Sequence, residues 1–523
     1  MAVAKYKYCL FTTFFMDRII VLDFGGQYCH LISRRIRDTG VYSEVLPNDV
    51  PVSKLRRIKG LKGIILSGGA ASVYDKHAPM CDKNILELGV PVLGICYGHQ
   101  LIAFLEQGRV ISGGAGEYGL TELSISGESR LLRGLGKKEG VWMNHRDVVK
   151  SLPPGYRVIA STEHSPIAVF ENEKKNVYGV QFHPEVTHTL RGDKILKNFV
   201  FSICKAKQEW AVSNYAGLIK KEIKKELGDK KAIIGLSGGI DSSTAAVLIS
   251  QVIGRNLTAV YVDTGLMRYK ETEFIKKVFQ KYPFRLRVVD ASNRFFKALR
   301  GVVEPEEKRR IIGGLFIKIF EEVAREEGAE VLVQGTIYSD RIESGVTRHS
   351  ATIKSHHNVA GLPKRMRLRL YEPLRELYKD EVRRLAKQLG LSDKLIHRHV
   401  FPGPGLGIRI IGEVTREKVG VVRRANHIIE QELEKSGWYD KVWMGFGVLL
   451  SVRSVGIQGD ERSYKYPLVV RIVESEDAMT ASFTRLPYKV LESISTRITN
   501  EIKEINRVVY DITNKPPATM EWE

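Results

Sequence analysis

Short apolar runs that end in glycine-rich turns, each followed by a helical stretch, recur along this chain. Two of these junctions constrain the fold most: the run ending at Leu93 leads into residues 94–98, and the run 232–236 leads into residues 237–243. Repeated strand–turn–helix units are typical of parallel α/β sheets. Because catalytic loops in such sheets lie at the carboxyl ends of the strands, we expect a functional site at each junction.

Changes in this alternation divide the chain into three expected domains. Residues 17–207 and 208–398 each alternate strands with helices, which predicts two doubly wound parallel-sheet α/β domains. Residues 399–523 do not alternate one to one, which predicts a small α+β domain. Its expected helices span 416–436 and 488–505, and its expected strands lie near 442–450 and 468–473.

Charge and cysteine content restrict the classes of protein. The 523 residues include 81 Lys and Arg against 60 Asp and Glu, a formal charge of +21, which suits either a nucleic-acid-binding protein or an enzyme of polyanionic nucleotides. Segments such as 220–226 mix both signs at helical spacing, as solvated helices do, so we expect no nucleic-acid partner. Five cysteines without a C-x-x-C pair argue against a disulfide scaffold and favour a cytoplasmic location.

Two segments stand outside the strand–helix pattern. Residues 1–15 contain a short apolar patch without a cleavage signal, and a strand-like run begins just after Met16. We interpret residues 1–15 as a loose extension, or Met16 as the functional start. Residues 335–369 show no clean periodicity, and a long polar loop inside an α/β domain is typical of a lid. No apolar run reaches the length of a membrane span, so we expect no membrane partner.

Cys96 lies at the centre of the first junction, in the sequence G-I-C-Y-G. This context is typical of a nucleophile elbow, and a helix N-terminus stabilises a thiolate. His183 and Glu185 follow the strand-like run 177–180 and, being two residues apart, point to the same side of an extended chain. We expect His183 to take the thiol proton and Glu185 to orient the imidazole. The alternative is a buried core cysteine, which these features together disfavour.

Backbone donors for a tetrahedral intermediate are available at two turns. The N–H of Tyr97 is one by elbow geometry, and the turn 67–69 offers a second at the end of another strand. The sequences G-I-C-Y-G-H-Q at 94–100 and Q-F-H-P-E at 181–185 resemble the class I glutamine amidotransferase family. That resemblance implies a triad of Cys96, His183 and Glu185 that forms a glutamyl thioester and releases ammonia. It also implies an oxyanion hole near Gly69 and Tyr97.

Two residues depart from that family's usual pattern. Ala70 follows the turn where proline is usual, and Asn144 stands where serine is usual. The second position lies where the family contacts substrate glutamine.

The second junction reads S-G-G-I-D-S-S at 237–243. Its glycines let the backbone approach phosphates, and its serine hydroxyls with the free N–H groups of a helix start form an anion cradle. Neither G-x-x-x-x-G-K-[ST] nor G-x-G-x-x-G is present, and an acidic Asp241 inside a phosphate loop suggests that a metal mediates. The plainer alternative is a serine-capped helix start after a glycine turn.

The same sequence resembles the PP-loop of the ATP pyrophosphatases. The resemblance implies that Mg²⁺ accompanies ATP and that a carbonyl oxygen of the acceptor is adenylylated. The ATP-binding residues implied are Ser237, Gly238, Gly239, Asp241, Ser242, Ser243 and Val262, the last beside adenine. NAD synthetases, argininosuccinate synthetases and tRNA thiolases share this loop, so the loop alone leaves the acceptor open.

Further segments resemble the GMP synthetase family, in the order amidotransferase, PP-loop ATPase and dimerisation domain. They are residues 335–344, 354–359, 398–406 and 506–523. The resemblance implies glutamine, ATP and xanthosine monophosphate (XMP) as substrates and a homodimer joined through the third domain. The implied roles are Asp340 and Glu343 near ATP, Asp241 and Asp340 near Mg²⁺, Lys354, His356 and His357 in a lid, and Arg309, Gln458, Arg507, Lys515 and Glu521 around XMP.

Rival hypotheses differ in the acceptor or in the class of protein. A glutamine-dependent NAD synthetase is the nearest, and a tRNA thiolase is weaker because no second catalytic cysteine accompanies the PP-loop. A basic nucleic-acid-binding protein on an inactive scaffold is the rival of another class, which an intact triad and PP-loop disfavour. By composition alone His356 and His357 also suit a metal site, but the rest of a ligand set is missing nearby.

Overall fold

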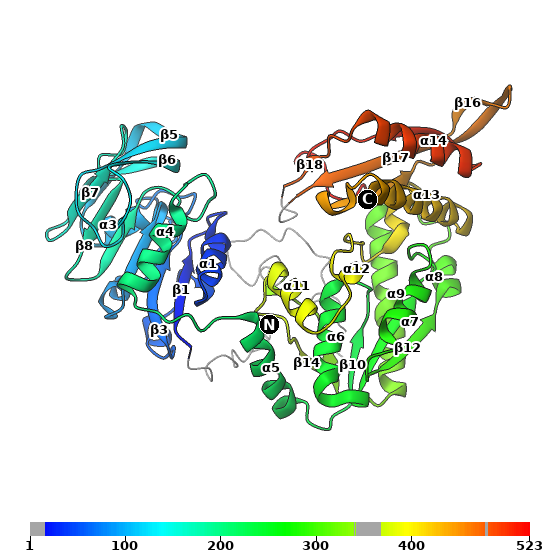
Figure 1. The fold of residues 1–523 in the computed structure, drawn as a ribbon, viewed down its shortest axis with the longest axis horizontal. Helices are drawn as coiled ribbons and strands as arrows, with labels where there is room; N and C mark the ends of the chain where they lie inside the picture. The colour runs from blue at the N-terminus through cyan, green and yellow to red at the C-terminus, as the bar shows by residue number, and fades with distance from the viewer. Residues whose placement is uncertain (1–15, 339, 341–367, 476–479) are drawn as a thin grey trace. The chain divides into compact units, whose positions relative to one another are not determined.

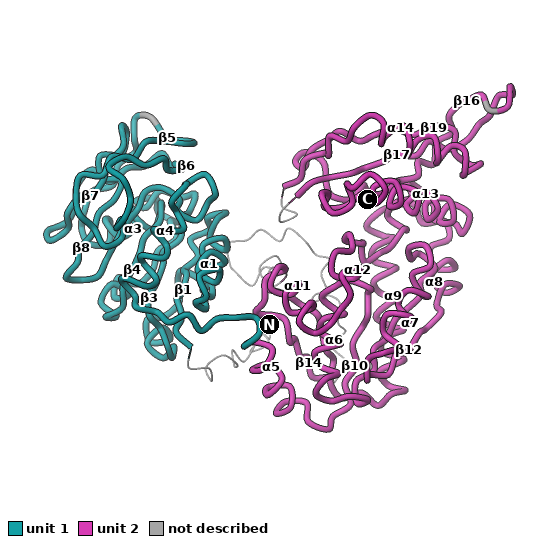
Figure 2. Tube along the Cα trace, viewed as in Figure 1, with its two compact units in different colours: residues 1–214, 347–351 teal, residues 215–346, 352–523 magenta. Residues whose placement is uncertain are grey.

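The structure is a computed structural model that describes residues 16–338, 340, 368–475 and 480–523. These residues form two compact units that divide between Asn214 and Tyr215 (Figure 2). Within the described residues, one sheet lies in the first unit and two lie in the second (Figure 1). The mixed α/β class with parallel sheets is confirmed. The division of the second unit at residue 398/399 stays a prediction.

The sheet of the first unit is parallel on one side and antiparallel on the other. Its described strands run in the order β2-β1-β3-β4-β9-β8-β7-β5-β6, and the pairs from β2 to β9 are parallel. The strands are β1 Arg18–Asp23, β2 Tyr42–Pro47, β3 Leu61–Leu66, β4 Val92–Ile95, β5 Arg109–Ile125, β6 Lys138–Ser151, β7 Arg157–Ser161, β8 Val169–Asn172 and β9 Val177–Val180.

Both faces of the parallel part are buried, as a doubly wound sheet requires. Along β1, Ile19 and Val21 face a core that includes residues of α1 (Cys29–Asp38) and α4 (Gly192–Lys197). Ile20 and Leu22 face a second core that includes residues of α3 (Tyr97–Leu105). The alternation follows from the two-residue period of a strand.

The first sheet of the second unit is parallel throughout the described pairs. Its order is β12-β11-β10-β13-β14, with β10 central. The strands are β10 Ala232–Gly235, β11 Leu257–Asp263, β12 Arg285–Asp290, β13 Val331–Val333 and β14 Arg369–Tyr371. The accompanying helices are α5 Val212–Glu226, α6 Ile240–Ile253, α7 Glu271–Phe279, α8 Ser292–Ala298, α9 Pro305–Glu326, α11 Lys379–Gln388 and α12 Asp393–Ile396.

The second sheet of this unit is built around the long strand β17 (Glu461–Glu474). β15 (Met444–Leu449), β16 (Ser454–Gln458) and β18 (Ser482–Phe483) pair with it antiparallel, and β19 (Ile505–Tyr510) pairs parallel. Helices α13 (Arg416–Lys435) and α14 (Tyr488–Glu501) pack on the sheet.

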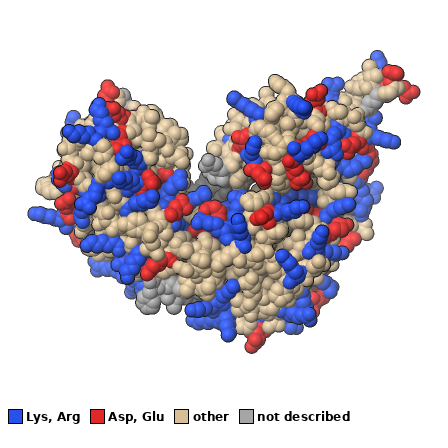
Figure 3. All heavy atoms as spheres, in the orientation of Figure 1, with Lys and Arg blue, Asp and Glu red and all other residues tan. Residues whose placement is uncertain are grey.

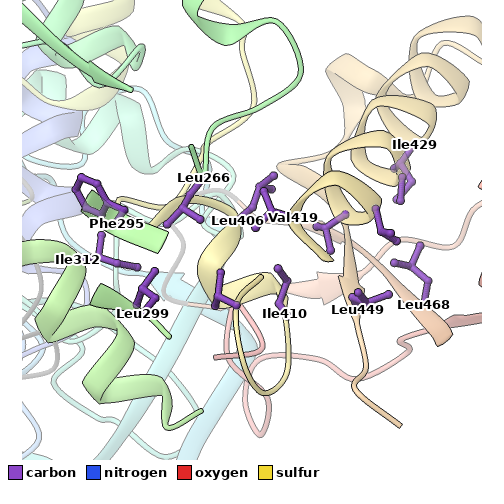
Figure 4. Close-up of a cluster of buried hydrophobic side chains, with 14 of the residues drawn as sticks. Leu266, Phe295, Leu299, Ile312, Leu406, Ile410, Val419, Ile429, Leu449 and Leu468 are labelled. Carbon is purple, nitrogen blue, oxygen red and sulfur yellow. The ribbon is translucent and has the colours of Figure 1, made fainter. Parts of the chain in front are cut away.

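One hydrophobic core joins the two sheets of the second unit. Leu266 and Phe295, from the parallel-sheet segment, belong to the same buried cluster as Ile429 of α13 and Leu468 of β17 (Figure 4). Leu406 and Ile410 lie in this cluster, between the two segments in sequence. The core therefore fixes the second sheet against the carboxyl-side loops of the parallel sheet.

The structure differs from the predicted elements at the C-terminal helix. The helix expected at 488–505 ends at Glu501, and Ile505–Tyr510 form β19 instead. Residues 506–510 alternate between half-buried and exposed positions, which is the strand period, and the sequence analysis had extended the helix to 505 and predicted no strand after it.

The surface carries both signs of charge. On the face visible in Figure 3, Lys and Arg are interspersed with Asp and Glu. Among the described residues, no helix combines the length and the apolar character needed to cross a bilayer.

Candidate active sites

Cys96 occupies a strained turn between β4 and α3. Its φ is +54°, a left-handed value that is uncommon for a residue with a side chain. The turn is held by a hydrogen bond from the Cys96 N–H to the Val180 carbonyl at 2.8 Å. A Cβ on Gly94 would lie 2.6 Å from the His99 nitrogen, and one on Gly98 would lie 2.7 Å from the Leu66 Cβ. Glycine is therefore required on both sides of the cysteine.

His183 and Glu185 lie beside this turn, just after β9. His183 Nδ1 is 2.7 Å from Glu185 Oε1, and both side chains are buried. A Cβ placed on Gly68 would lie 3.2 Å from His183 Cε1 and 3.7 Å from Cys96 Cβ, so both residues border Gly68. The structure thus brings the three predicted triad residues together around one glycine.

The His183 imidazole is biased toward its charged form. Burial acts to lower its pKa, but the negative charges of Glu185 and Cys96 outweigh burial and raise the pKa well above its ordinary value. A raised imidazole pKa favours a thiolate–imidazolium pair, the reactive state of a cysteine nucleophile.

The two predicted oxyanion residues lie next to each other. A Cβ on Gly69 would come within 3.2 Å of Tyr97 Cγ, and Tyr97 begins α3 directly after the nucleophile. The Asn144 position also borders the site, because the Cys96 Sγ lies 3.7 Å from its main-chain carbonyl oxygen. Since the main chain makes this contact, it does not depend on serine or asparagine at position 144.

Several supporting residues in the first unit were missed by sequence reasoning. Gln100 Nε2 donates to the Asp147 carbonyl at 2.8 Å, which ties α3 to β6 beside the cysteine. Arg35 Nε of α1 donates to the Glu185 carbonyl at 3.0 Å. Gln100 could have been found from the sequence, since it belongs to the G-H-Q end of the elbow motif. Arg35 gave no such signal, because it is 150 residues away from Glu185.

The PP-loop residues form a turn between β10 and α6. Gly238 has a φ of +77°, and Gly239 caps the helix N-terminus. The Ser237 and Ser242 hydroxyl oxygens are 3.1 Å apart, and Ser243 donates to the Gly239 carbonyl at 2.7 Å. The loop therefore presents free backbone N–H groups at the start of a 14-residue helix, which suits an anion.

Asp241, in the first turn of α6, has one paired and one unpaired carboxylate oxygen. Oδ2 accepts from Lys379 Nζ at 2.6 Å, while Oδ1 is buried and has no hydrogen-bond partner within the described residues. A carboxylate oxygen without a partner, beside a turn predicted to bind phosphate, fits a Mg²⁺ ligand. No cluster of three or more His, Cys, Asp or Glu in metal-binding geometry occurs among the residues described.

The other predicted ATP residues are placed as follows. The Val262 side chain is buried in the core of the second unit, so its role beside adenine stays a prediction. Asp340 Oδ2 accepts from the Ile337 N–H at 3.1 Å. Glu343, Lys354, His356 and His357 lie outside the described residues.

The predicted XMP residues lie on separate elements of the second unit. Arg309 of α9 donates to the Glu523 carbonyl, and Glu521 accepts from Arg409 at 2.8 and 3.0 Å. Arg507 of β19 donates to the Val455 carbonyl at 3.4 Å. Lys515 pairs with Ala481 through the main chain, and Gln458 ends β16. These contacts do not by themselves define a nucleotide pocket, so the XMP site stays a prediction.

Curated relatives match almost the whole chain. A "GMP synthase [glutamine-hydrolyzing]" from Caldanaerobacter subterraneus subsp. tengcongensis is 50% identical over 97% of this chain and 99% of its own length. Enzymes with the same description from Aquifex aeolicus and Symbiobacterium thermophilum are each 51% identical, with the same coverage.

The chain belongs to the GMP synthase family. Family models divide it as this membership implies. "Glutamine amidotransferase class-I" matches residues 20–203, "NAD synthase" matches 211–310 and "GMP synthase C terminal domain" matches 431–522. The NAD synthase match covers part of the ATPase segment alone, whereas the GMP synthase relatives extend across the predicted acceptor residues. A solved structure from Thermoplasma acidophilum, described as that of a GMP synthase subunit, is 33% identical over 40% of this chain and 98% of its own, with a TM-score of 0.32.

Proposed function

We propose that this GMP synthase family member uses Cys96 to release ammonia from glutamine and residues 237–243 to bind the ATP that activates XMP. The observation that supports the first half most strongly is the elbow at Cys96, with a φ of +54°, beside the His183–Glu185 pair. The thiolate attacks the amide carbon of glutamine, and His183 gives its proton to the departing ammonia. Water then hydrolyses the thioester to glutamate, while the N–H groups of Gly69 and Tyr97 stabilise each oxyanion.

The second half-reaction is an adenylyl transfer. The O2 atom of XMP attacks the α-phosphorus of ATP, and pyrophosphate leaves. Ammonia then attacks the activated carbon, AMP leaves, and the product is GMP. The N–H groups at the start of α6 and the hydroxyls of Ser237 and Ser242 would hold the departing pyrophosphate. Arg309, Arg507 and Lys515 would supply the positive charge that a nucleoside monophosphate needs.

Mg²⁺ is the metal that these residues fit. Asp241 Oδ1 would hold it, with Asp340 as the second carboxylate. The chemistry that bound Mg²⁺ would supply there is positive charge close to the phosphate oxygens of ATP. Lys379 already neutralises the other oxygen of Asp241 and so fixes the carboxylate in one orientation.

A homodimer in the cytoplasm is the assembly that we propose. The β16–β17 hairpin exposes Ile457, which is 76% accessible. Val455 and Tyr464 lie directly opposite each other in the ladder and are also exposed. Exposed apolar residues gathered on one hairpin are typical of a protein interface. Ile457→Glu should raise the fraction of monomer in sedimentation velocity experiments, and an unchanged distribution would argue against this interface.

The test of the proposed function is a pyrophosphate-release assay. Protein, ATP, Mg²⁺ and glutamine are combined with XMP, nicotinate adenine dinucleotide, citrulline with aspartate, or tRNA in turn. We expect pyrophosphate only with XMP, together with equimolar GMP. Pyrophosphate release with another acceptor and none with XMP would refute the acceptor assignment while leaving the roles of Cys96 and the PP-loop intact.

A further inference from the structure

An ion pair between a buried carboxylate and a half-buried guanidinium borders Gly238 of the PP-loop. The Glu271 carboxylate, at the start of α7, accepts from Arg398 Nη1 at 2.7 Å and from Nη2 at 2.6 Å. The Glu271 side chain is 4% exposed and that of Arg398 is 17% exposed. A two-pronged guanidinium–carboxylate pair shielded from water has one preferred geometry, so it holds the atoms around it in place.

The loop backbone is in contact with this pair. A Cβ on Gly238 would lie 2.6 Å from Glu271 Oε1 and 3.7 Å from Arg398 Nη1. Gly238 has a φ of +77°, the left-handed conformation that lets the loop turn its N–H groups toward a ligand. The carboxylate and the guanidinium therefore limit how far this turn can relax.

Arg398 is itself fixed from several directions. Its guanidinium carbon lies 4.2 Å from the centroid of the Phe274 ring, one turn further along α7. The next residue, His399, stacks on Tyr439 with ring centroids 3.8 Å apart. His399 Nε2 also lies 2.7 Å from the Tyr439 carbonyl oxygen. Tyr439 follows α13, so the segment after the parallel sheet sets the position of Arg398.

A second arginine, this time bonded to main-chain carbonyl oxygens, contacts the loop that follows β11. Arg423 of α13 donates through Nε to the Met267 carbonyl at 2.9 Å and through Nη2 to the Gly265 carbonyl at 2.5 Å. Tyr269 stacks on His427 of α13 at 4.5 Å. The loops that follow β10 and β11 are thus both braced by residues beyond 397.

We propose that Arg398 is a positioning residue for ATP, which acts through Glu271 to hold the PP-loop in its pyrophosphate-binding conformation. This inference rests on the proposed role of residues 237–243 and extends it to a residue that acts through the Glu271 side chain. Arg398 thereby helps to determine the geometry of the PP-loop, residues 237–243, which precedes it by more than 150 residues in sequence.

Arg398→Lys tests the proposal, because lysine keeps the positive charge but cannot make the two parallel hydrogen bonds of a guanidinium to Glu271. We expect the KM for ATP and the inhibition constant of pyrophosphate to rise together by about tenfold, since the loop is no longer held in its pyrophosphate-binding conformation. The KM for XMP and the glutaminase rate should stay within about twofold of wild type. The matched control is Arg294→Lys, which breaks an equally two-pronged pair with Glu322 (2.7 and 3.0 Å) on the surface, away from the loop.

Each outcome decides between positioning and a purely structural role. Unchanged ATP and pyrophosphate constants in a folded Arg398→Lys protein, with or without a lower Tm, would overturn the proposal. An equal rise in the KM for XMP would also overturn it. If Arg398→Lys does not fold, Glu271→Gln is measured in the same way and the same results decide. Ser242→Ala tests ATP binding by residues 237–243 separately from the role of Arg398. An unchanged KM for ATP in Ser242→Ala would refute the PP-loop assignment itself, whatever Arg398→Lys shows.

Discussion

The Nδ1 atom of His183 lies 2.7 Å from Oε1 of Glu185, and both side chains are shielded from solvent. A carboxylate can only accept, so Nδ1 carries the proton and Nε2 is the nitrogen available for proton exchange. Nε2 has no hydrogen-bond partner among the described residues, although Cys96 borders the same glycine. This arrangement supports the proposed roles, orientation of the imidazole for Glu185 and proton transfer for His183.

Glu185→Gln should therefore slow glutamine hydrolysis by about 10²-fold while changing the KM for glutamine little, because an amide orients the imidazole but does not stabilise its charge. The measurement is steady-state release of glutamate. Ammonia-driven GMP formation by the same protein is the control, and we expect it to match wild type. A wild-type glutaminase rate would show that Glu185 does not support His183.

The same variant makes a prediction about stability and pH. Because the folded-state pKa of His183 is raised, the Glu185–His183 pair stabilises the fold fully below the unfolded pKa of about 6.5, and this contribution is lost as pH rises through the raised folded value. Wild type should exceed Glu185→Gln by about 2 kcal/mol in free energy of unfolding at pH 6. The gap should narrow at alkaline pH in urea titrations, and a gap that widens with pH would contradict the account.

Much of the fold followed from the sequence because its signals were local. The strand-like run expected at 177–180 lies next to turns, and the structure has β9 at the same bounds, Val177–Val180. The long hairpin of β5 and β6 was not predicted. Its strands are exposed on one face and interrupted by a register shift between Ser112 and Glu117, which removes the simple period.

The candidate sites divide in the same way. Cys96 and residues 237–243 were found because each lies in a glycine-containing turn between an expected strand and an expected helix, and this pattern can be recognised in the sequence. The partners Lys379 of Asp241 and Arg398 of Glu271 lie 138 and 127 residues away from them, so only folding reveals those pairs. The predicted lid residues lie outside the described part of the chain, and their roles stay predictions.

The glycine after the nucleophile gives a packing prediction. Gly98→Ala places a Cβ 2.7 Å from that of Leu66, so the elbow must shift, and we expect a loss of about 1–3 kcal/mol in free energy of unfolding together with a lower glutaminase rate. Gly114→Ala is the matched control in the same unit, because a Cβ there meets nothing within 4 Å. Equal stability of the two variants in urea would contradict the elbow geometry.

A buried lysine gives a second prediction about stability. Lys308 Nζ donates to Ile410 O at 2.7 Å and to Glu523 Oε2 at 2.5 Å, and its side chain is fully buried. Lys308→Met removes the ammonium group from both acceptors, which should cost about 3–5 kcal/mol in free energy of unfolding. Lys318→Met, at an exposed position on the same helix, should cost less than about 0.5 kcal/mol. If Lys308→Met loses no more free energy of unfolding than Lys318→Met in urea titrations, Lys308 makes no net contribution to stability.

Asp241 gives a prediction about the metal. Asp241→Asn removes the charge from the oxygen that has no partner, and we expect the Mg²⁺ concentration for half-maximal pyrophosphate release to rise by about tenfold or more. Lys379→Met is the comparison, because it unpairs the other oxygen without removing the carboxylate. An unchanged Mg²⁺ requirement in Asp241→Asn would exclude this carboxylate as a ligand.

The measurement that tests the central claim most directly is GMP formation by Cys96→Ala, with glutamine and with ammonium chloride as alternative nitrogen donors. The account predicts that glutamine-driven synthesis falls by at least about 10³-fold, because the nucleophile is gone, whereas ammonia-driven synthesis from ATP and XMP stays at the wild-type rate. Equal loss with both donors, or full activity with glutamine, would contradict a division of labour between Cys96 and the PP-loop.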